Sequence, residues 1–184
     1  PQREHALDRL EQVLVLVVEL EVGVTRDAEG MVRADAHSGE ELVEEVDIEG
    51  NVLRIVTRAD MRAGRLRHRT TFIAVVDSDG RLLAHQRSPN KDVWPSRWDI
   101  AAGGVAAVGE AWDVGARREL AEELGIEAPI EHLGGGTYDD DEVRTVAQVF
   151  VARHSGKYRF ADGEVVDARW LTLAELHALV ESQP

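Results

Sequence analysis

Hydrophobic residues follow two different periods along the chain, and from residue 41 onward they predict short strands interleaved with helices. Alternating or continuous apolar stretches bounded by turn residues predict strands at residues 42–47, 51–57, 70–77, 81–87, 130–138, 143–154 and 165–172. The turn sequences IEGN and SDG join the first four of these into two antiparallel hairpins. Helical spacing predicts helices at residues 110–125 and 173–181. The result is a mixed α/β layer fold.

Residues 1–40 have a different character from the rest of the chain. Leu7, Leu10 and Leu14 have helical spacing, but the sequence then becomes a β-branched run, so helix and strand both stay open. We interpret residues 1–40 as an extension of unknown role, favouring packing or oligomerisation, with a homodimer among the expected assemblies. We assign residues 41–184 to a single domain.

Charge and composition exclude several classes of protein. The net charge of -14 opposes general binding to a nucleic-acid polymer, and a phosphate ligand would need a local cation. The absence of cysteine excludes disulfide frameworks, thiolate metal sites and cysteine nucleophiles. The longest unbroken apolar run covers residues 13–18, so neither a signal peptide nor a membrane span is expected. We therefore expect a cytoplasmic protein with no membrane partner.

The helix at residues 110–125 carries an unusual concentration of negative charge. Glu119, Glu122 and Glu123 lie beside the apolar stripe of the helix, where like charges repel. Because side chains lean toward the helix N-terminus, Glu119 is expected over Gly115, where space remains for an ion. Mg²⁺ prefers such carboxylate oxygens. The alternative is a solvated acidic face paired with neighbouring arginines.

The three glutamates belong to a longer pattern of fixed spacing, formed by Gly104, Glu110, Arg118, Glu119, Leu120, Glu122, Glu123, Gly125 and Ile126. This pattern, Gly-x5-Glu-x7-Arg-Glu-U-x-Glu-Glu-x-Gly-U with U aliphatic, resembles the Nudix hydrolase family at every position. The resemblance implies an α/β/α sandwich with a mixed sheet, and hydrolysis of a diphosphate linked to another group. It also implies Mg²⁺ or Mn²⁺ as cofactor.

The resemblance also implies roles for individual residues. Glu119, Glu122 and Glu123 are the implied metal ligands, and Gly104 lets the backbone approach the metal. Glu110 and Arg118 match an ion pair that braces the loop. The general base is Glu119 or a later glutamate, for which Glu164 is the first choice and Glu142 the reserve.

Residues 41–184 further resemble proteins similar to isopentenyl-diphosphate isomerase, through LRHRTTFIAVVDSDGRLLAHQRSPNKDVWPSRWD and AAGGV. Arg87 and Lys91 match the isomerase residues that contact the substrate diphosphate. However, Gly103 and Val105 stand where the isomerases have cysteine and histidine. Trp94 and Trp98 are candidates for the wall of a substrate pocket, although core packing is expected for at least one of them.

Three functions follow from these residues. The leading one is a metal-dependent pyrophosphohydrolase acting on a small diphosphate compound of the nucleoside-diphosphate type or another kind. The second is an isomerase, which the missing cysteine disfavours. The third is a sensor that binds a diphosphate ligand without cleaving it, which the complete set of glutamates disfavours.

Overall fold

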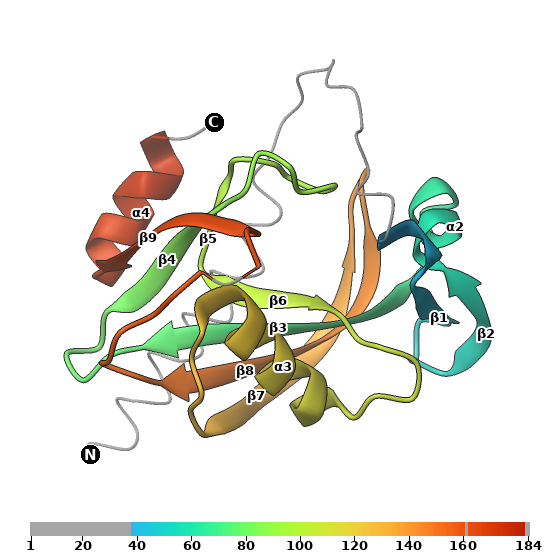
Figure 1. Cartoon of the computed structure of the whole chain (residues 1–184), viewed down its shortest axis with the longest axis horizontal. Coiled ribbons are helices and arrows are strands. Elements are labelled where there is room, and N and C mark those ends of the chain that lie inside the picture. Colours follow the sequence, from blue (N-terminus) through green and yellow to red (C-terminus); the bar gives the residue numbers. More distant parts are fainter. Residues whose placement is uncertain (1–37, 161, 183–184) are drawn as a thin grey trace.

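A curled mixed sheet with helices on its two faces forms the body of the protein in a computed structural model that describes residues 38–160 and 162–182 (Figure 1). The strands are β1 (Leu42–Val46), β2 (Val52–Thr57), β3 (His68–Val76), β4 (Leu82–Arg87), β5 (Trp98–Asp99), β6 (Ala101–Val105), β7 (Ile130–Asp139), β8 (Arg144–Arg153) and β9 (Val165–Leu171). The helices are the 3₁₀ turn η1 (Ser38–Glu40), α2 (Arg58–Ala63), α3 (Trp112–Leu124) and α4 (Leu173–Ser182).

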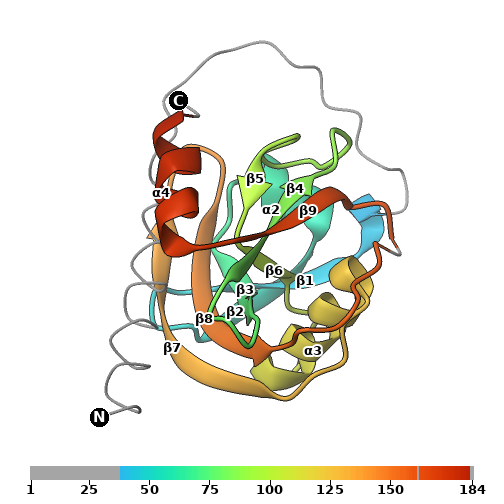
Figure 2. The ribbon, with the colours of Figure 1, turned by 90° about the vertical axis from the view of Figure 1, so that its left-hand side faces the viewer.

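Strand β3 runs through the centre of the sheet. It pairs antiparallel with β6 and parallel with β8, and its two ends meet β1 and β4. Beyond these strands, β7 pairs with β8, and β4 pairs with β5 and β9. The sheet is therefore mixed, and helices α3 and α4 lie on opposite sides of it (Figure 2). This arrangement confirms the predicted α/β/α sandwich.

The sequence of β3 explains its central position. Ile73 and Val75 pack into the cluster that contains the apolar face of α3, whereas Ala74 and Val76 pack into the cluster that contains Leu176 of α4. Successive side chains of a strand point to opposite faces, so a strand covered on both faces needs a continuous apolar run. The sequence FIAVV supplies that run.

Most predicted elements are confirmed, and the differences concern strand partners and short elements that depend on contacts between distant parts of the chain. β1 and β2 form the expected hairpin, but β3 and β4 pair only at the turn, at Val76 and Leu82. Beyond the turn β3 pairs with β6, a strand that the sequence did not predict. Helix α2 was also not predicted, because its six residues contain one buried apolar side chain, Met61. The proposed extension at residues 1–40 lies outside the described residues up to residue 37.

Candidate active site

Helix α3 presents two of its three clustered glutamates to the protein interior. Its buried face consists of Ala116, Leu120 and Leu124, which pack against β3 and β8 in the core. Glu119 and Glu123 are 8% and 1% exposed, so both carboxylates are nearly removed from water, whereas the Glu122 side chain is 52% exposed. A buried carboxylate requires a partner of opposite charge or a set of donors. The helix ends at Gly125, which adopts the left-handed conformation with φ 61°.

Arg118 links the glutamates of this helix to the preceding loop. Its Nε and Nη2 atoms donate to the two oxygens of Glu110 at 3.0 Å each, and its Nη1 donates to Glu119 at 2.7 Å and to Glu122 at 3.0 Å. The bidentate bond to Arg118 lowers the pKa of Glu110, and the same bond raises the pKa of Arg118. Glu110 also accepts the N–H of Ala107 at 2.9 Å, which closes the loop between β6 and α3.

Gly104 lies directly against the Glu119 carboxylate. A Cβ atom at Gly104 would lie 2.7 Å from Oε1 of Glu119, so only glycine leaves this carboxylate in place. The expected open space beside Gly115 is a wrong prediction, because a Cβ atom there would lie 2.8 Å from Oε2 of Glu110. The carboxylate of Glu110, from the loop before α3, occupies that volume.

Lys91 connects the second buried glutamate to the segment before β9. Its Nζ atom lies 3.2 Å from Oε1 of Glu123 and also contacts Glu164, while the N–H of Gly103 donates to Oε2 of Glu123 at 3.0 Å. Burial raises the pKa of Glu123, and Lys91 offsets only part of that effect. Burial acts on Glu164 in the same direction, but the Lys91 ammonium, together with smaller effects of Glu123 and Arg58, lowers the pKa of Glu164. The Ser88 N–H donates to the Glu164 carbonyl at 2.8 Å, which fixes this segment to the end of β4.

Arg87 and Glu142, two further residues predicted from the sequence, have contacts of their own outside the buried glutamates. Arg87 donates from Nη2 to the carbonyl of Val93 at 2.9 Å, and its Nη1 lies 3.7 Å from Asp99, so its guanidinium holds the loop at residues 88–97. Glu142 lies exposed in the turn between β7 and β8, where its N–H donates to Asp140 at 2.7 Å. Among the described contacts, Glu164 reaches Lys91 and Glu142 does not.

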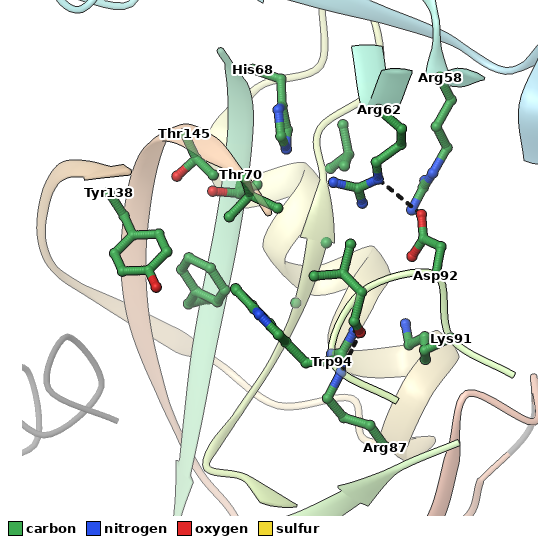
Figure 3. Close-up of a pocket in the computed structure, with 16 residues that line it drawn as sticks. Arg58, Arg62, His68, Thr70, Arg87, Lys91, Asp92, Trp94, Tyr138 and Thr145 are labelled. Atoms are coloured by element: carbon green, nitrogen blue, oxygen red, sulfur yellow. Dashed lines mark hydrogen bonds and ion pairs between the residues drawn. The ribbon is translucent and has the colours of Figure 1, made fainter. Parts of the chain in front are cut away.

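The structure contains a pocket of about 540 Å³, counting its open mouth, and Figure 3 shows the residues that line it. Lys91, Gly103 and Gly104 join its wall to Glu123 and Glu119. Its other lining residues are Arg58, Arg62, His68, Thr70, Phe72, Arg87, Asp92, Val93, Trp94, Val105, Tyr138, Val143 and Thr145. Such a mixture of aromatic walls and a few charged groups is typical of sites for small ligands.

Several pocket residues were missed or left undecided from the sequence. Trp94 lines the pocket, whereas Trp98 is packed against the core with Arg169 over its ring at 3.9 Å. His68 is buried, and its Nδ1 lies 2.9 Å from the Leu66 carbonyl. Arg58 and Arg62 carried no signal in the sequence except their spacing of four residues, which is common on surface helices.

The donor atoms around α3 suit a hard divalent cation. Glu119 and Glu123 offer buried carboxylate oxygens. Because Gly104 has no side chain, the backbone of β6 comes close to the Glu119 carboxylate. In the described part of the chain, no three histidine, aspartate or glutamate side chains converge in a preformed ligand cluster. The cations of Arg118 and Lys91 instead pair with these carboxylates. Oxygen donors in this arrangement fit Mg²⁺ or Mn²⁺.

Comparisons with known proteins identify the family of this chain. A family model for the NUDIX domain matches residues 66–184. The chain belongs to the Nudix family. It is 37% identical over 139 residues to the uncharacterized Nudix hydrolase YfcD of Escherichia coli K12, covering 75% of this chain and 77% of that protein. With the hydrolase domain established in this way, this Nudix protein is an enzyme of the pyrophosphohydrolase type.

Solved structures share the Nudix fold. DR0079 from Deinococcus radiodurans has a TM-score of 0.67 at 24% identity, over 78% of this chain and 90% of that one. The NUDIX domain of Shewanella oneidensis NrtR, complexed with ADP ribose, has a TM-score of 0.54 at 22% identity, over 67% of this chain and 88% of that one. In the described part of this Nudix protein, no helix has the length and hydrophobicity needed to cross a bilayer.

Proposed function

We propose that this protein hydrolyses the diphosphate linkage of a small diphosphate compound in a reaction that depends on Mg²⁺ or Mn²⁺. The observation that carries the proposal is the pair of nearly buried carboxylates, Glu119 and Glu123, placed beside a pocket lined with cations. Burying two negative charges is costly unless cations offset them. We place the reaction in the cytoplasm, as the sequence predicts.

Glu119, Glu122 and Glu123 are the side chains that would hold the cation, with the backbone at Gly104 as a further oxygen ligand. Glu122 is the most exposed of the three, and Arg118 bonds both Glu119 and Glu122. When bound, the divalent ion neutralises phosphate charge and lowers the pKa of a water molecule.

The remaining chemistry belongs to residues that move a proton or position the substrate. Glu164 is our candidate for the general base, because it contacts Lys91, which lines the pocket, and its side chain is 44% exposed, so solvent water can reach it. Glu119 is the alternative base. Lys91 supplies positive charge for the substrate diphosphate, and Arg87 fixes the loop that carries Lys91. Arg118 and Glu110 hold the start of α3 in register with β6.

We place the protein near the branch of the family that resembles isopentenyl-diphosphate isomerase, but as a hydrolase. Gly103 occupies the position of the isomerase cysteine, and a Cβ atom there would lie 2.0 Å from the Thr71 carbonyl oxygen. A cysteine at this position would require the backbone to move. Val105, at the position of the isomerase histidine, offers no proton donor to the pocket.

A nucleoside-diphosphate compound is our first choice of substrate. Trp94 and Tyr138 meet edge to face with ring centroids 6.3 Å apart, which gives the pocket an aromatic wall suited to a planar group. The ADP ribose in the complex of the similar NUDIX domain makes that compound a rational member of the test panel.

The proposal is tested by incubating the purified protein with a panel of diphosphate compounds, including ADP ribose, and identifying products by mass spectrometry. We expect monophosphate products with Mg²⁺ or Mn²⁺ and none with EDTA. The Glu123→Gln variant should remain folded and lose turnover. Full activity of that variant would exclude Glu123 from the mechanism, and tight binding without products would favour the sensor instead.

A further inference from the structure

Helix α2 precedes the span matched by the NUDIX family model, yet it supplies two side chains to the pocket. Arg58 and Arg62 are four residues apart, which places them on one face of a helix. Met61 is 1% exposed and anchors the adjoining side of the helix against Val43 and Val105. Figure 3 shows both arginines extending from α2 toward Asp92 and the pocket.

The arginines are carried by a rigidly attached helix. Thr57 caps its start by accepting the Asp60 N–H at 3.1 Å, and the Gly64 N–H donates to the Asp60 carbonyl at 2.9 Å. The Arg58 N–H donates to the Glu41 carbonyl at 2.7 Å. Cations held in place before binding lose less entropy when they bind a ligand.

Both guanidinium groups retain donors for a ligand. Within the described residues, the side-chain hydrogen bonds of Arg58 and Arg62 are one each, from Nη1 to Glu41 at 2.9 Å and from Nε to Asp92 at 2.8 Å. A guanidinium has five N–H donors, so most of them remain. Lys91, in contrast, contacts both Glu123 and Glu164.

The charge lining the pocket favours a ligand with several negative groups. Arg58, Arg62, Arg87 and Lys91 line it, and Asp92 is the one carboxylate among the described lining residues. This concentration of positive charge stands out in a chain of net charge -14. Each of these cations already contacts a carboxylate outside or at the rim of the pocket, and a phosphate would accept further hydrogen bonds from the donors that the two arginines of α2 retain.

We propose that Arg58 and Arg62 form a second phosphate subsite, which selects substrates with at least one phosphate beyond the diphosphate that is cleaved. The subsite adjoins the candidate catalytic carboxylates, because Asp92, the partner of Arg62, follows Lys91, the partner of Glu123 and Glu164. This inference rests on the proposed function. The extra phosphate is either the third of a linear chain or a group on the attached nucleoside.

The test is calorimetric titration in EDTA with adenosine 5′-diphosphate, adenosine 5′-triphosphate and adenosine 3′-phosphate 5′-diphosphate. We expect at least one of the two compounds with the extra phosphate to bind about tenfold tighter than the diphosphate, a difference of about 1.4 kcal/mol. Which of them binds tighter identifies the source of the phosphate. Equal affinities for all three compounds would overturn the proposal.

Variants locate the effect on α2. The affinity gap is the ratio of the affinities for the compounds with and without the extra phosphate. The double variant Arg58→Gln with Arg62→Gln should reduce this gap to within about twofold, because the donors to the extra phosphate are lost. Arg54→Gln is the matched control, since Arg54 pairs with Glu45 on the same hairpin and does not line the pocket. An equal loss of affinity for every compound would instead place the arginines on the cleaved diphosphate and refute the second subsite.

A second pair of substitutions guards against misfolding. Arg62→Gln together with Asp92→Asn removes both charges and leaves no unpaired carboxylate. This variant should also narrow the affinity gap, and a gap of unchanged size would contradict the proposal. The calorimetry measures binding alone, and the product assay with Mg²⁺ measures hydrolysis alone. Selective binding with no hydrolysis would refute the proposed function alone. Hydrolysis with no selectivity in binding would refute the subsite alone.

Discussion

Gly104 and Glu119 lie so close that a methyl group on Gly104 would be 2.7 Å from Oε1 of Glu119. Glu119 is 8% exposed, and its Oε1 also accepts a hydrogen bond from Arg118 at 2.7 Å, so it has little freedom to move away. The glycine of β6 and the glutamate of α3 are therefore one fitted unit, and the backbone of the strand reaches the carboxylate without a side chain between them.

Gly104→Ala should reduce turnover by about tenfold to a hundredfold, because a displacement of about 1 Å at a catalytic group has effects of that size. Steady-state kinetics with the substrate found in the panel measures the loss. Gly136→Ala on β7 is the matched control, since no atom lies within 4 Å of a Cβ atom there. Equal activities of the two variants would mean that Glu119 tolerates displacement.

The local parts of this unit were predictable from the sequence. Apolar residues at Ala116, Leu120 and Leu124 predicted Glu119, Glu122 and Glu123 beside the core. Glu119 and Glu123 are buried, but the prediction is wrong for Glu122, whose side chain is 52% exposed. The pocket was less predictable, because Arg58 and Arg62 reach it through the packing of Met61 under β1 and β6. No short-range pattern encodes that packing. The role of Arg87 in holding Val93 also depends on the path of a loop.

Glu164→Gln should lower kcat by a factor of about 10² to 10⁴ and change KM little, because a glutamine cannot accept the proton of the attacking water. Glu164 contacts Lys91, which contacts Glu123, so its carboxylate lies at the candidate site. Stopped-time assays across substrate concentrations separate kcat from KM.

Glu142→Gln provides the control for this prediction. Glu142 is exposed between β7 and β8, and its substitution should leave kcat unchanged. If Glu142→Gln were the damaging change and Glu164→Gln the harmless one, the general base would have been assigned to the wrong loop.

Arg118→Lys should lower the free energy of unfolding by roughly 1–3 kcal/mol, because lysine keeps the charge but cannot make the bidentate bond to Glu110. Urea unfolding followed by circular dichroism measures the change. Arg117→Lys on the neighbouring exposed position should have almost no effect. Similar stabilities of both variants would show that the loop between β6 and α3 does not depend on the Arg118 fork.

The folded protein should lose stability as the pH falls from about 6.5 toward 4, because burial lowers the pKa of His85 from 6.5 to about 4. His85 is 1% exposed, and its Nδ1 has no hydrogen-bond partner among the described residues. In this window the unfolded chain binds a proton that the folded chain excludes, so stability is complete above pH 6.5 and declines below it. The decline from this one group reaches up to about 3 kcal/mol.

Urea unfolding measures this effect at pH 7.0 and pH 4.5. The difference in the free energy of unfolding between the two pH values should be smaller for His85→Gln than for the unaltered protein. His177→Gln, at an exposed position of α4, should keep the full difference, and an unchanged difference in His85→Gln would show that His85 is protonated in the folded state.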